Sequence, residues 1–341
     1  MRAAFLDALT ERMEREPDLF VLTADTGFHV FDDFRVRFAP RFLNVGIAEA
    51  TMIGVAAGLA LEGRKVVTYG IAPFVTFRCH EQVRDCLCHP RLPVTIVGVG
   101  AGLAYGPAGM THHAIEDVAV MAALPGMTVV CPGDPVETRH AVLGLAGVRG
   151  PAYLRLGRSG ETPVHAGPLP SFAIGRAVDV ADGGDVAILA TGTMLATAVD
   201  AARLLAARGI EAEVVGFPTV KPLDLDRLDR VAARHRAVAT LEEHVASGGF
   251  GAAVAVRLAG AGWGGTLRVF AIPDEYATHA GSREHLLAGY GLSAEAVAAS
   301  LRDIVRGRPL RARPGRPGAG RAGGSGAVRG RAGATRPGGP R

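Results

Sequence analysis

The chain has 341 residues, of which 48% are hydrophobic, and its mean hydropathy is +0.23. This length and composition are sufficient for the cores of two domains. The sequence contains no run of about 18 uninterrupted apolar residues, and charged residues interrupt its first helix-like segment. We therefore expect neither a membrane span nor a signal peptide, and we predict a cytoplasmic protein that does not bind membranes.

The positive charge lies at the C-terminal end of the chain. From residue 307 onward there are nine arginines and no acid, so removing nine charges from +4 leaves about −5 for the rest. This end is rich in Gly, Pro and Arg, which cannot form a core, and we predict that residues 307–341 are a disordered tail. The remaining chain has no basic face that would fit a polyanion, so no specific nucleic-acid binding is expected.

Strand-like and helix-like apolar patterns alternate along the first half of the chain. Such alternation indicates a parallel sheet covered by helices on both faces, which is the α/β class. We place this first domain at residues 1–160. Its predicted strands are 19–24, 65–69, 94–97, 127–131 and 152–155, and its predicted helices are 3–15, 49–60, 74–88, 114–123 and 135–146.

The same alternation returns after a segment that carries Thr-Pro, Gly-Pro and Leu-Pro pairs. We predict that this segment, residues 161–171, is a linker. A second, smaller α/β domain with a parallel sheet is predicted at residues 172–306. Its predicted strands are 186–190, 212–216, 237–240 and 267–270, and its predicted helices are 194–208, 225–234, 250–260 and 295–305.

One acid, Glu49, stands at the start of a helix that is otherwise made of apolar and small residues. Met52, Val55 and Leu59 repeat at helical spacing, and Gly and Ala cover the other faces, so we expect this helix to be buried on most sides. A carboxylate in such a place needs a strong hydrogen-bond donor, or it stays protonated with a raised pKa. The alternative is a solvated Glu that complements the helix dipole.

Two adjacent histidines, His112 and His113, follow a Gly-rich loop after the predicted strand 94–97. Parallel α/β folds bind ligands outside the carboxyl ends of their strands. Imidazole titrates near neutral pH, so we predict acid and base chemistry in this loop.

Other motifs do not match their ligand sites. The third glycine of a dinucleotide fingerprint would fall at Leu103, and the sequence has neither a G-x-S-x-G nor a P-loop motif. On a helix Cys86 and Cys88 would point to nearly opposite faces while Cys79 and Cys86 would share one. Buried structural thiols are therefore favoured over a zinc site.

Taken together, these segments resemble the C-terminal half of transketolases over about residues 1–305. That half comprises the pyrimidine-binding domain and the transketolase C-terminal domain. The motifs that carry the resemblance are Asn44-Val-Gly-Ile-Ala-Glu-Ala-Thr-Met52, Phe74-Val-Thr-Phe77 with His80, Gly109-Met-Thr-His112, Ala152-Tyr-Leu-Arg-Leu-Gly-Arg158, Phe217-Pro-Thr-Val-Lys-Pro-Leu-Asp224 and Glu242-Glu-His-Val-Ala-Ser-Gly-Gly-Phe-Gly251.

The resemblance implies that the chain binds thiamine diphosphate. Glu49 would hydrogen-bond N1′ of the aminopyrimidine and favour the imino tautomer, whose 4′-nitrogen deprotonates the thiazolium C2. Phe77, with Phe74 nearby, would stack on the aminopyrimidine, and His80 would belong to the same pocket. Asp25 corresponds to a family aspartate near the thiazolium.

The resemblance also implies roles on the substrate side. His112, together with His113 or His80, would move protons on substrate oxygens. Arg158 would clamp a phosphate or carboxylate. His29 aligns with a family serine that helps to hold a sugar phosphate.

The family's metal motif, Gly-Asp-Gly followed by Asn some 25 residues later, has no counterpart in this sequence. Gly133-Asp134 and Gly184-Asp185 are followed by Pro and Val, and Asn44 is the only asparagine, so no metal ligand is predicted in this chain. We therefore expect a separate N-terminal subunit that carries this motif and holds most of the Mg²⁺ and diphosphate. Within such a heterotetramer, an α2β2 complex, this chain would form a homodimer.

The substrate pocket departs from the family. Gly100 replaces a histidine, and Pro107 and Ala108 replace an acidic pair. We predict a transketolase-like transferase that transfers a two-carbon ketol or related acyl unit but uses ordinary pentose and hexose phosphates poorly. The alternatives are the β-subunit of a 2-oxoacid dehydrogenase, an acyloin-forming enzyme, and a non-catalytic scaffold subunit.

Overall fold

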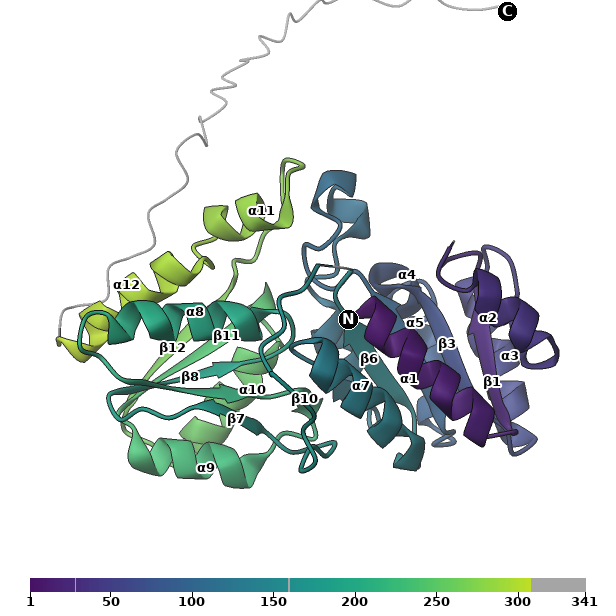
Figure 1. Cartoon of the computed structure of the whole chain (residues 1–341), viewed down its shortest axis with the longest axis horizontal. Helices are drawn as coiled ribbons and strands as arrows, with labels where there is room; N and C mark the ends of the chain where they lie inside the picture. The colour runs from purple at the N-terminus through teal and green to yellow at the C-terminus, as the bar shows by residue number, and fades with distance from the viewer. Residues whose placement is uncertain (28, 159, 308–341) are drawn as a thin grey trace, which may run out of the picture.

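The computed structural model describes residues 1–27, 29–158 and 160–307 of the chain. These residues form two α/β units side by side, each with a sheet between layers of helices (Figure 1). The predicted α/β class with two successive domains is confirmed. Residues 308–341, where we predict a disordered tail, lie outside the described residues. In the described part of the chain, no helix is long and apolar enough to cross a membrane.

The first sheet has seven described strands in the order β10-β5-β6-β4-β3-β1-β2. Neighbours are parallel except that β10 runs antiparallel to β5, so the sheet is mixed at one edge rather than purely parallel as predicted. The strands are β1 (Leu19–Thr23), β2 (Phe42–Asn44), β3 (Lys65–Ile71), β4 (Val94–Val99), β5 (Thr128–Val130), β6 (Ala152–Leu156) and β10 (Thr219–Lys221). Its helices are α1 (Arg2–Arg15), α2 (Asp32–Arg37), α3 (Glu49–Leu61), α4 (Ala72–Thr76), α5 (His80–Gln82), α6 (Asp117–Ala123) and α7 (Pro135–Gly144).

The second sheet has five described strands in the order β12-β11-β8-β9-β7. It is also mixed, because β7 at its edge runs antiparallel to β9. Helices α8 and α12 contact each other over this sheet, and α9 contacts α10. The elements are β7 (Val178–Ala181), β8 (Val186–Ala190), α8 (Met194–Ala206), β9 (Ala212–Gly216), α9 (Leu225–Arg234), β11 (Ala237–Val245), α10 (Phe250–Gly260), β12 (Thr266–Ile272), α11 (Arg283–Gly289) and α12 (Ala294–Val305).

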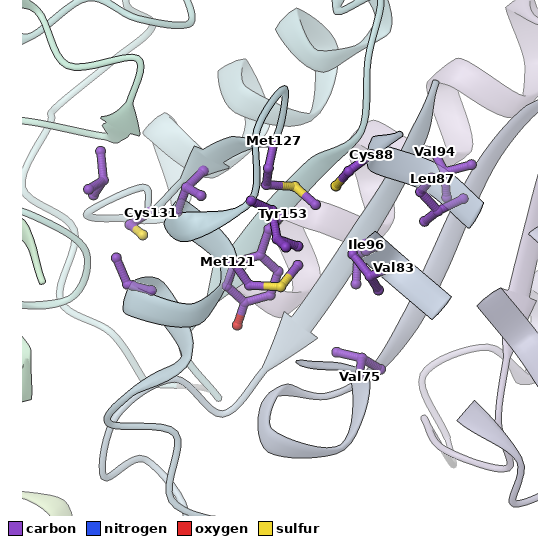
Figure 2. Close-up of a cluster of buried hydrophobic side chains, with 14 of the residues drawn as sticks. Val75, Val83, Leu87, Cys88, Val94, Ile96, Met121, Met127, Cys131 and Tyr153 are labelled. Carbon is purple, nitrogen blue, oxygen red and sulfur yellow. The ribbon is translucent and has the colours of Figure 1, made fainter. Parts of the chain in front are cut away.

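The two units share a strand and a core. After the second sheet has begun, the chain returns to the first sheet, where β10 pairs with β5 and Lys221 Nζ donates to Ala122 O and Leu124 O at 2.7 and 2.6 Å. One buried cluster runs from α3, β3 and β4 through to β9 and α10 of the second unit. Figure 2 shows Met121, Met127 and Tyr153 together in this cluster. The two units therefore pack through a continuous hydrophobic core.

Helix α3 begins at Glu49 as predicted, and Gly63 follows its C-cap residue with φ +80°, which confirms the predicted helix end. The helix is not buried on most sides, however. Met52, Ile53 and their buried neighbours face the sheet, whereas Gly54 and Gly58 face open space. The chain's own contacts therefore do not give the predicted burial on this face, since small residues fit both a tight interface and an open surface.

The predicted helix 74–88 is broken in the structure. Helix α4 ends at Thr76, a short α5 follows, and residues Val83–Cys88 form a π-helix. The helix predicted at 114–123 begins only at Asp117, because Ala114 instead pairs with Gly102 in an isolated bridge. Both mispredicted segments lie beside the candidate site. Irregular helical geometry of this kind is common at functional sites.

Candidate active site

The predicted site residues gather at the carboxyl ends of the first sheet's strands. Asp25 follows β1, Glu49 follows β2, and Phe74 follows β3. His112 lies in the long loop after β4, and Arg158 follows β6. Because these strands are parallel neighbours, their exits meet at one edge of the sheet, which is the edge that binds ligands in open α/β folds.

Glu49 is buried, with 4% of its surface exposed, at the first position of α3. Its two carboxylate oxygens each accept a hydrogen bond of 3.2 Å from Nη1 of Arg78. The helix start also favours negative charge. Glu49 is therefore a buried carboxylate that pairs with a half-exposed arginine at the mouth of the site.

An aromatic side chain, Phe74, lies against both Arg78 and His112. The Arg78 guanidinium carbon lies 3.9 Å from the centroid of the Phe74 ring, and the neighbouring Phe77 keeps 37% of its surface exposed. Phe74 also meets His112 edge to face, at 5.3 Å between ring centroids. Nδ1 of His80 is buried and has no hydrogen-bond partner in the described part of the chain. A flat ring with polar nitrogens would fit beside these groups.

Asp25 has φ +53°, in the left-handed region, and is held by the chain's only asparagine. Asn44 Oδ1 accepts the Asp25 N–H at 2.9 Å and the Gly46 N–H at 3.0 Å. Asn44 Nδ2 donates to Asp25 Oδ1 at 3.2 Å. Asn44 thus ties the exit of β1 to the exit of β2.

The two loop histidines have different surroundings. His112 is partly exposed, and its Nδ1 lies 3.1 Å from the Thr111 hydroxyl. His113 is buried, with 3% of its surface exposed, and burial lowers its pKa, so its ring is neutral at pH 7. Of the pair, His112 therefore faces the site and Phe74, while His113 points into the protein.

A buried polar network, which the sequence did not predict, supports the histidine loop. Arg155 donates to both Asp117 oxygens at 2.8 and 3.0 Å, and Tyr153 donates to Asp117 at 2.6 Å. Burial alone would raise the pKa of Asp117, but the Arg155 guanidinium outweighs it and keeps that pKa below its usual value. Arg155 also donates to the carbonyls of Ala114 and Glu243 at 2.8 and 3.0 Å, which joins loop, sheet and second unit.

The Glu-Glu-His segment lies within the buried strand β11 and holds other loops. Glu243 accepts the Leu103 N–H at 2.7 Å and the Thr193 hydroxyl at 2.9 Å, and it pairs with Arg283 at 2.5 Å. His244 Nε2 accepts the Ala119 N–H at 3.3 Å. This family motif therefore fixes the loop after β4 and the start of α6 against the second unit.

The structure does not show all the residues predicted to bind substrate in contact with one another. Arg158 lies over the ring of Tyr105, at 5.0 Å from its centroid, and Tyr105 also faces His112 at 6.1 Å. His29 is 95% exposed at its side chain and lies 3.4 Å from Asp32. Tyr105 was missed because a single aromatic residue in a Gly-rich loop carries no spacing signal.

The cysteines are free thiols, and Cys79, Cys88 and Cys131 are buried. Burial raises the pKa of Cys79 to about 12 and that of Cys88 to about 11, so both remain protonated at neutral pH. The described residues contain no group of three or more His, Cys, Asp or Glu side chains placed to hold a metal ion.

Comparison with known proteins identifies the class. Residues 1–161 match the family model "Transketolase, pyrimidine binding domain", and residues 175–297 match "Transketolase, C-terminal domain". The two matched domains together correspond to the C-terminal half of a thiamine-diphosphate-dependent enzyme, the half that contains the pyrimidine-binding domain. The chain belongs to the transketolase family.

Three relatives show which part of such an enzyme it resembles. One of the subunits of the apulose-4-phosphate transketolase of Phocaeicola vulgatus is 35% identical, over 89% of this chain and 97% of the relative. The 6-deoxy-6-sulfo-D-fructose transketolase subunit of a Clostridium species is 34% identical, over 91% and 96%. The solved structure of a split-gene transketolase, an inactive β4 tetramer, is 38% identical over 89% and 97%, with a TM-score of 0.79.

Two of these relatives are named as transketolase subunits, and the third comes from a split-gene transketolase. The chain is accordingly a transketolase-like transferase subunit that corresponds to the C-terminal half of the enzyme, as the sequence predicted. The matches favour this assignment over a 2-oxoacid dehydrogenase β-subunit. They also imply dependence on thiamine diphosphate and a partner subunit.

The residues present fit the pyrimidine end of this cofactor. A buried carboxylate at Glu49, an exposed aromatic face at Phe77 and the unpartnered Nδ1 of His80 offer the polar and stacking contacts that an aminopyrimidine needs.

Proposed function

We propose that Glu49 is the proton-exchanging acid of a two-carbon ketol transfer, or of a related acyl transfer, that this chain performs with its partner subunit. The observation that carries the proposal is the buried carboxylate at the start of α3, which binds Arg78, whose guanidinium in turn lies on the Phe74 ring. A solvated Glu that only complements the helix dipole would not need this burial or this pairing.

Each residue has a defined task in this proposal. When bound, thiamine diphosphate supplies a nucleophilic carbon that can take up and release a two-carbon unit. Glu49 holds a proton at its carboxylate for exchange with the pyrimidine N1′. Phe74 and Phe77 would orient the ring and exclude water, and Asp25 would act near the thiazolium.

His112 is the better candidate for moving protons on substrate oxygens. It is partly exposed and contacts Phe74, whereas His113 is buried and neutral. A proton carrier needs access to the substrate as well as a suitable pKa. We assign His113 to packing of the loop and His80 to the cofactor pocket.

We further propose that a separate N-terminal subunit with a Gly-Asp-Gly…Asn motif holds Mg²⁺ and most of the diphosphate in an α2β2 complex. Two observations support this division. Asn44 is occupied by Asp25 and Gly46, and Asp134 caps α7 through Glu137 while its second oxygen accepts from the linker backbone. The related split-gene β4 tetramer is inactive, which agrees with a need for the other subunit.

The substrate class follows from Arg158 and from the names of the relatives. The two relatives' names contain a phosphate and a sulfonate group. Arg158 is exposed and lies over the Tyr105 ring, and no ion pair to it is found in the described residues. We propose a substrate whose chain ends in such an anion and makes fewer hydroxyl contacts than ordinary sugar phosphates.

Titration calorimetry tests the two-chain proposal. The chain alone should show no tight, Mg²⁺-dependent binding of thiamine diphosphate, and addition of the matching N-terminal subunit should create it together with ketol transfer. Tight Mg²⁺-dependent binding by this chain alone would contradict the proposal.

A further inference from the structure

The aromatic ring of Tyr105 fills the space that a side chain at position 100 would need. Gly100 has φ +87°, and a Cβ added there would lie 2.0 Å from Cε2 of Tyr105. The backbone cannot easily shift to relieve this contact, because the N–H groups of Gly100 and Ala101 both bind Leu156 O at 3.0 Å. The glycine and the ring therefore form one unit at the end of β4.

One face of this ring holds a cation. The guanidinium carbon of Arg158 lies 5.0 Å from the centroid of the Tyr105 ring. Arg158 is exposed, and within the described residues no hydrogen bond or ion pair to a protein acid satisfies it. A guanidinium stacked on an aromatic face keeps its in-plane N–H groups available for the oxygens of an anion.

The ring also faces the proton-moving histidine. The centroids of Tyr105 and His112 lie 6.1 Å apart at an interplanar angle of 64°, and His112 also meets Phe74 at 5.3 Å. Tyr105 thus contacts both the residue that would act on a substrate oxygen and the residue that would hold its charged end. A cavity of about 260 Å³ opens beside Arg158, lined also by Pro107, Glu161, Thr193 and Arg283.

We propose that Tyr105 is a positioning and specificity-determining residue for a substrate with an anionic end. Its ring orients Arg158, and its bulk takes the place of a hydrogen-bonding side chain at position 100. The subsite therefore selects for phosphate or sulfonate and offers few donors to sugar hydroxyls. This inference deepens the proposed function and rests on the assignment of Arg158 to the substrate.

The first test uses inorganic phosphate and the chain alone. The Nε–H resonance of Arg158, identified by its loss in Arg158→Lys, should shift on titration with phosphate. Because a cation–π contact at an exposed site changes an equilibrium about 2- to 5-fold, Tyr105→Leu should weaken this binding by that factor. Tyr105→Phe keeps the ring face and should stay within about twofold of wild type.

The second test uses the reconstituted complex with hydroxypyruvate as a fixed, saturating two-carbon donor. Tyr105→Leu should raise KM for glycolaldehyde phosphate about 2- to 5-fold while KM for glycolaldehyde and kcat stay within about twofold. In an Arg158→Met background, Tyr105→Leu should have no further effect on KM. Arg64→Met is the matched control, because Arg64 lies over Phe20 at 5.8 Å at the opposite end of the strands.

Several outcomes would overturn the inference. For the wild type, these outcomes are no response of Arg158 to phosphate and no preference of the complex for the phosphorylated aldehyde. For the variants, they are an equal rise of KM for both aldehydes in Tyr105→Leu, or a Tyr105→Phe variant as impaired as Tyr105→Leu. Thermal unfolding checks that each variant is folded. Exchange of the cofactor C2 proton separates the two proposals, because it depends on Glu49 and should be unchanged in Tyr105→Leu; its absence in wild type would refute the proposed function instead.

Discussion

Arg78 holds the carboxylate of Glu49 from the mouth of the site. Its Nη1 lies 3.2 Å from both carboxylate oxygens, and its guanidinium lies on the ring of Phe74. Glu49 is buried, whereas half of the Arg78 side chain is exposed. A ring nitrogen that binds Glu49 must share these oxygens with Arg78 or displace it.

We therefore expect Arg78→Met to tighten cofactor binding by the reconstituted complex. A partly exposed ion pair is worth up to about 1 kcal/mol, so Kd should fall about 2- to 5-fold. Calorimetry at constant Mg²⁺ measures this. Arg84→Met is the control, since within the described residues Arg84 pairs with the exposed Asp85 in the same segment and with no other acid. Weaker binding in Arg78→Met would mean that Arg78 itself contributes to the cofactor site.

Glu49→Gln should nearly abolish the reaction. The amide keeps the shape but cannot donate and recover a proton, and general acid–base catalysis contributes about 10²- to 10⁴-fold in rate. A residue that only complements a helix dipole contributes about 0.3–1 kcal/mol. Turnover and C2-proton exchange at saturating cofactor measure the difference, with Glu81→Gln at an exposed position as control. Rates within a few-fold of wild type would remove Glu49 from the catalytic site.

The Asp117–Arg155 pair should be essential for stability. Removing one partner of a buried pair costs about 3–5 kcal/mol because the other charge is left buried, so Asp117→Asn should strongly lower the free energy of unfolding in urea. Asp200→Asn breaks an exposed pair with Arg203 and should cost less than about 1 kcal/mol. Similar losses in both variants would show that the buried network contributes little.

Glu242 should make stability depend on pH. Burial raises its pKa to about 7, although two backbone N–H groups, of Phe250 and Gly251, oppose the rise. The folded state therefore holds a proton that the unfolded state loses at lower pH. The contribution of Glu242 to the free energy of unfolding is therefore greatest below about pH 4.5 and falls as pH rises through 7. At about 1.4 kcal/mol per pH unit, the total loss is about 3 kcal/mol.

The comparison of wild type with Glu242→Gln isolates this effect, because glutamine does not titrate. From pH 5 to pH 8, the wild type should lose more free energy of unfolding than Glu242→Gln does. A difference that stays constant over this range would show that Glu242 is ionised throughout.

Ordinary sugar phosphates should be poor substrates. Gly100, Pro107 and Ala108 offer no side-chain hydrogen bonds to sugar hydroxyls. At about 0.5–1.5 kcal/mol for each missing bond, two such losses lower kcat/KM by about 5- to 160-fold. The measurement compares xylulose 5-phosphate and ribose 5-phosphate with glycolaldehyde phosphate in the reconstituted complex. Equal efficiency with both kinds of substrate would contradict the prediction.

The local sequence was sufficient to predict features of the site that are determined by a single segment of the chain, such as the bounds of helix α3. The start of α3 at Glu49 and its end before Gly63 follow from residues within a few positions of each boundary. The alternation of the longer strands and helices follows from periodicity in the same way, whereas the short elements β2, β7, β10, α2 and α11 were not predicted. These features need no knowledge of distant contacts.

The remaining parts depend on contacts between distant segments. Glu243 binds Leu103 across 140 positions of sequence, and Arg155 binds Asp117 across 38. Neither pairing leaves a periodic signal, so the network beneath the histidine loop could not be predicted. The π-helix after α5 was missed for a related reason, because its residues also suit a regular helix.

The return of β10 to the first sheet decides where this polypeptide can be divided. A cut in the linker would leave β5 without the neighbour that a later part of the chain supplies, and a bare strand edge invites self-association. The linker therefore connects the two units in sequence, but it does not separate them into two independently complete folds. Gene fission at that point would yield two fragments that must find each other again before either is complete.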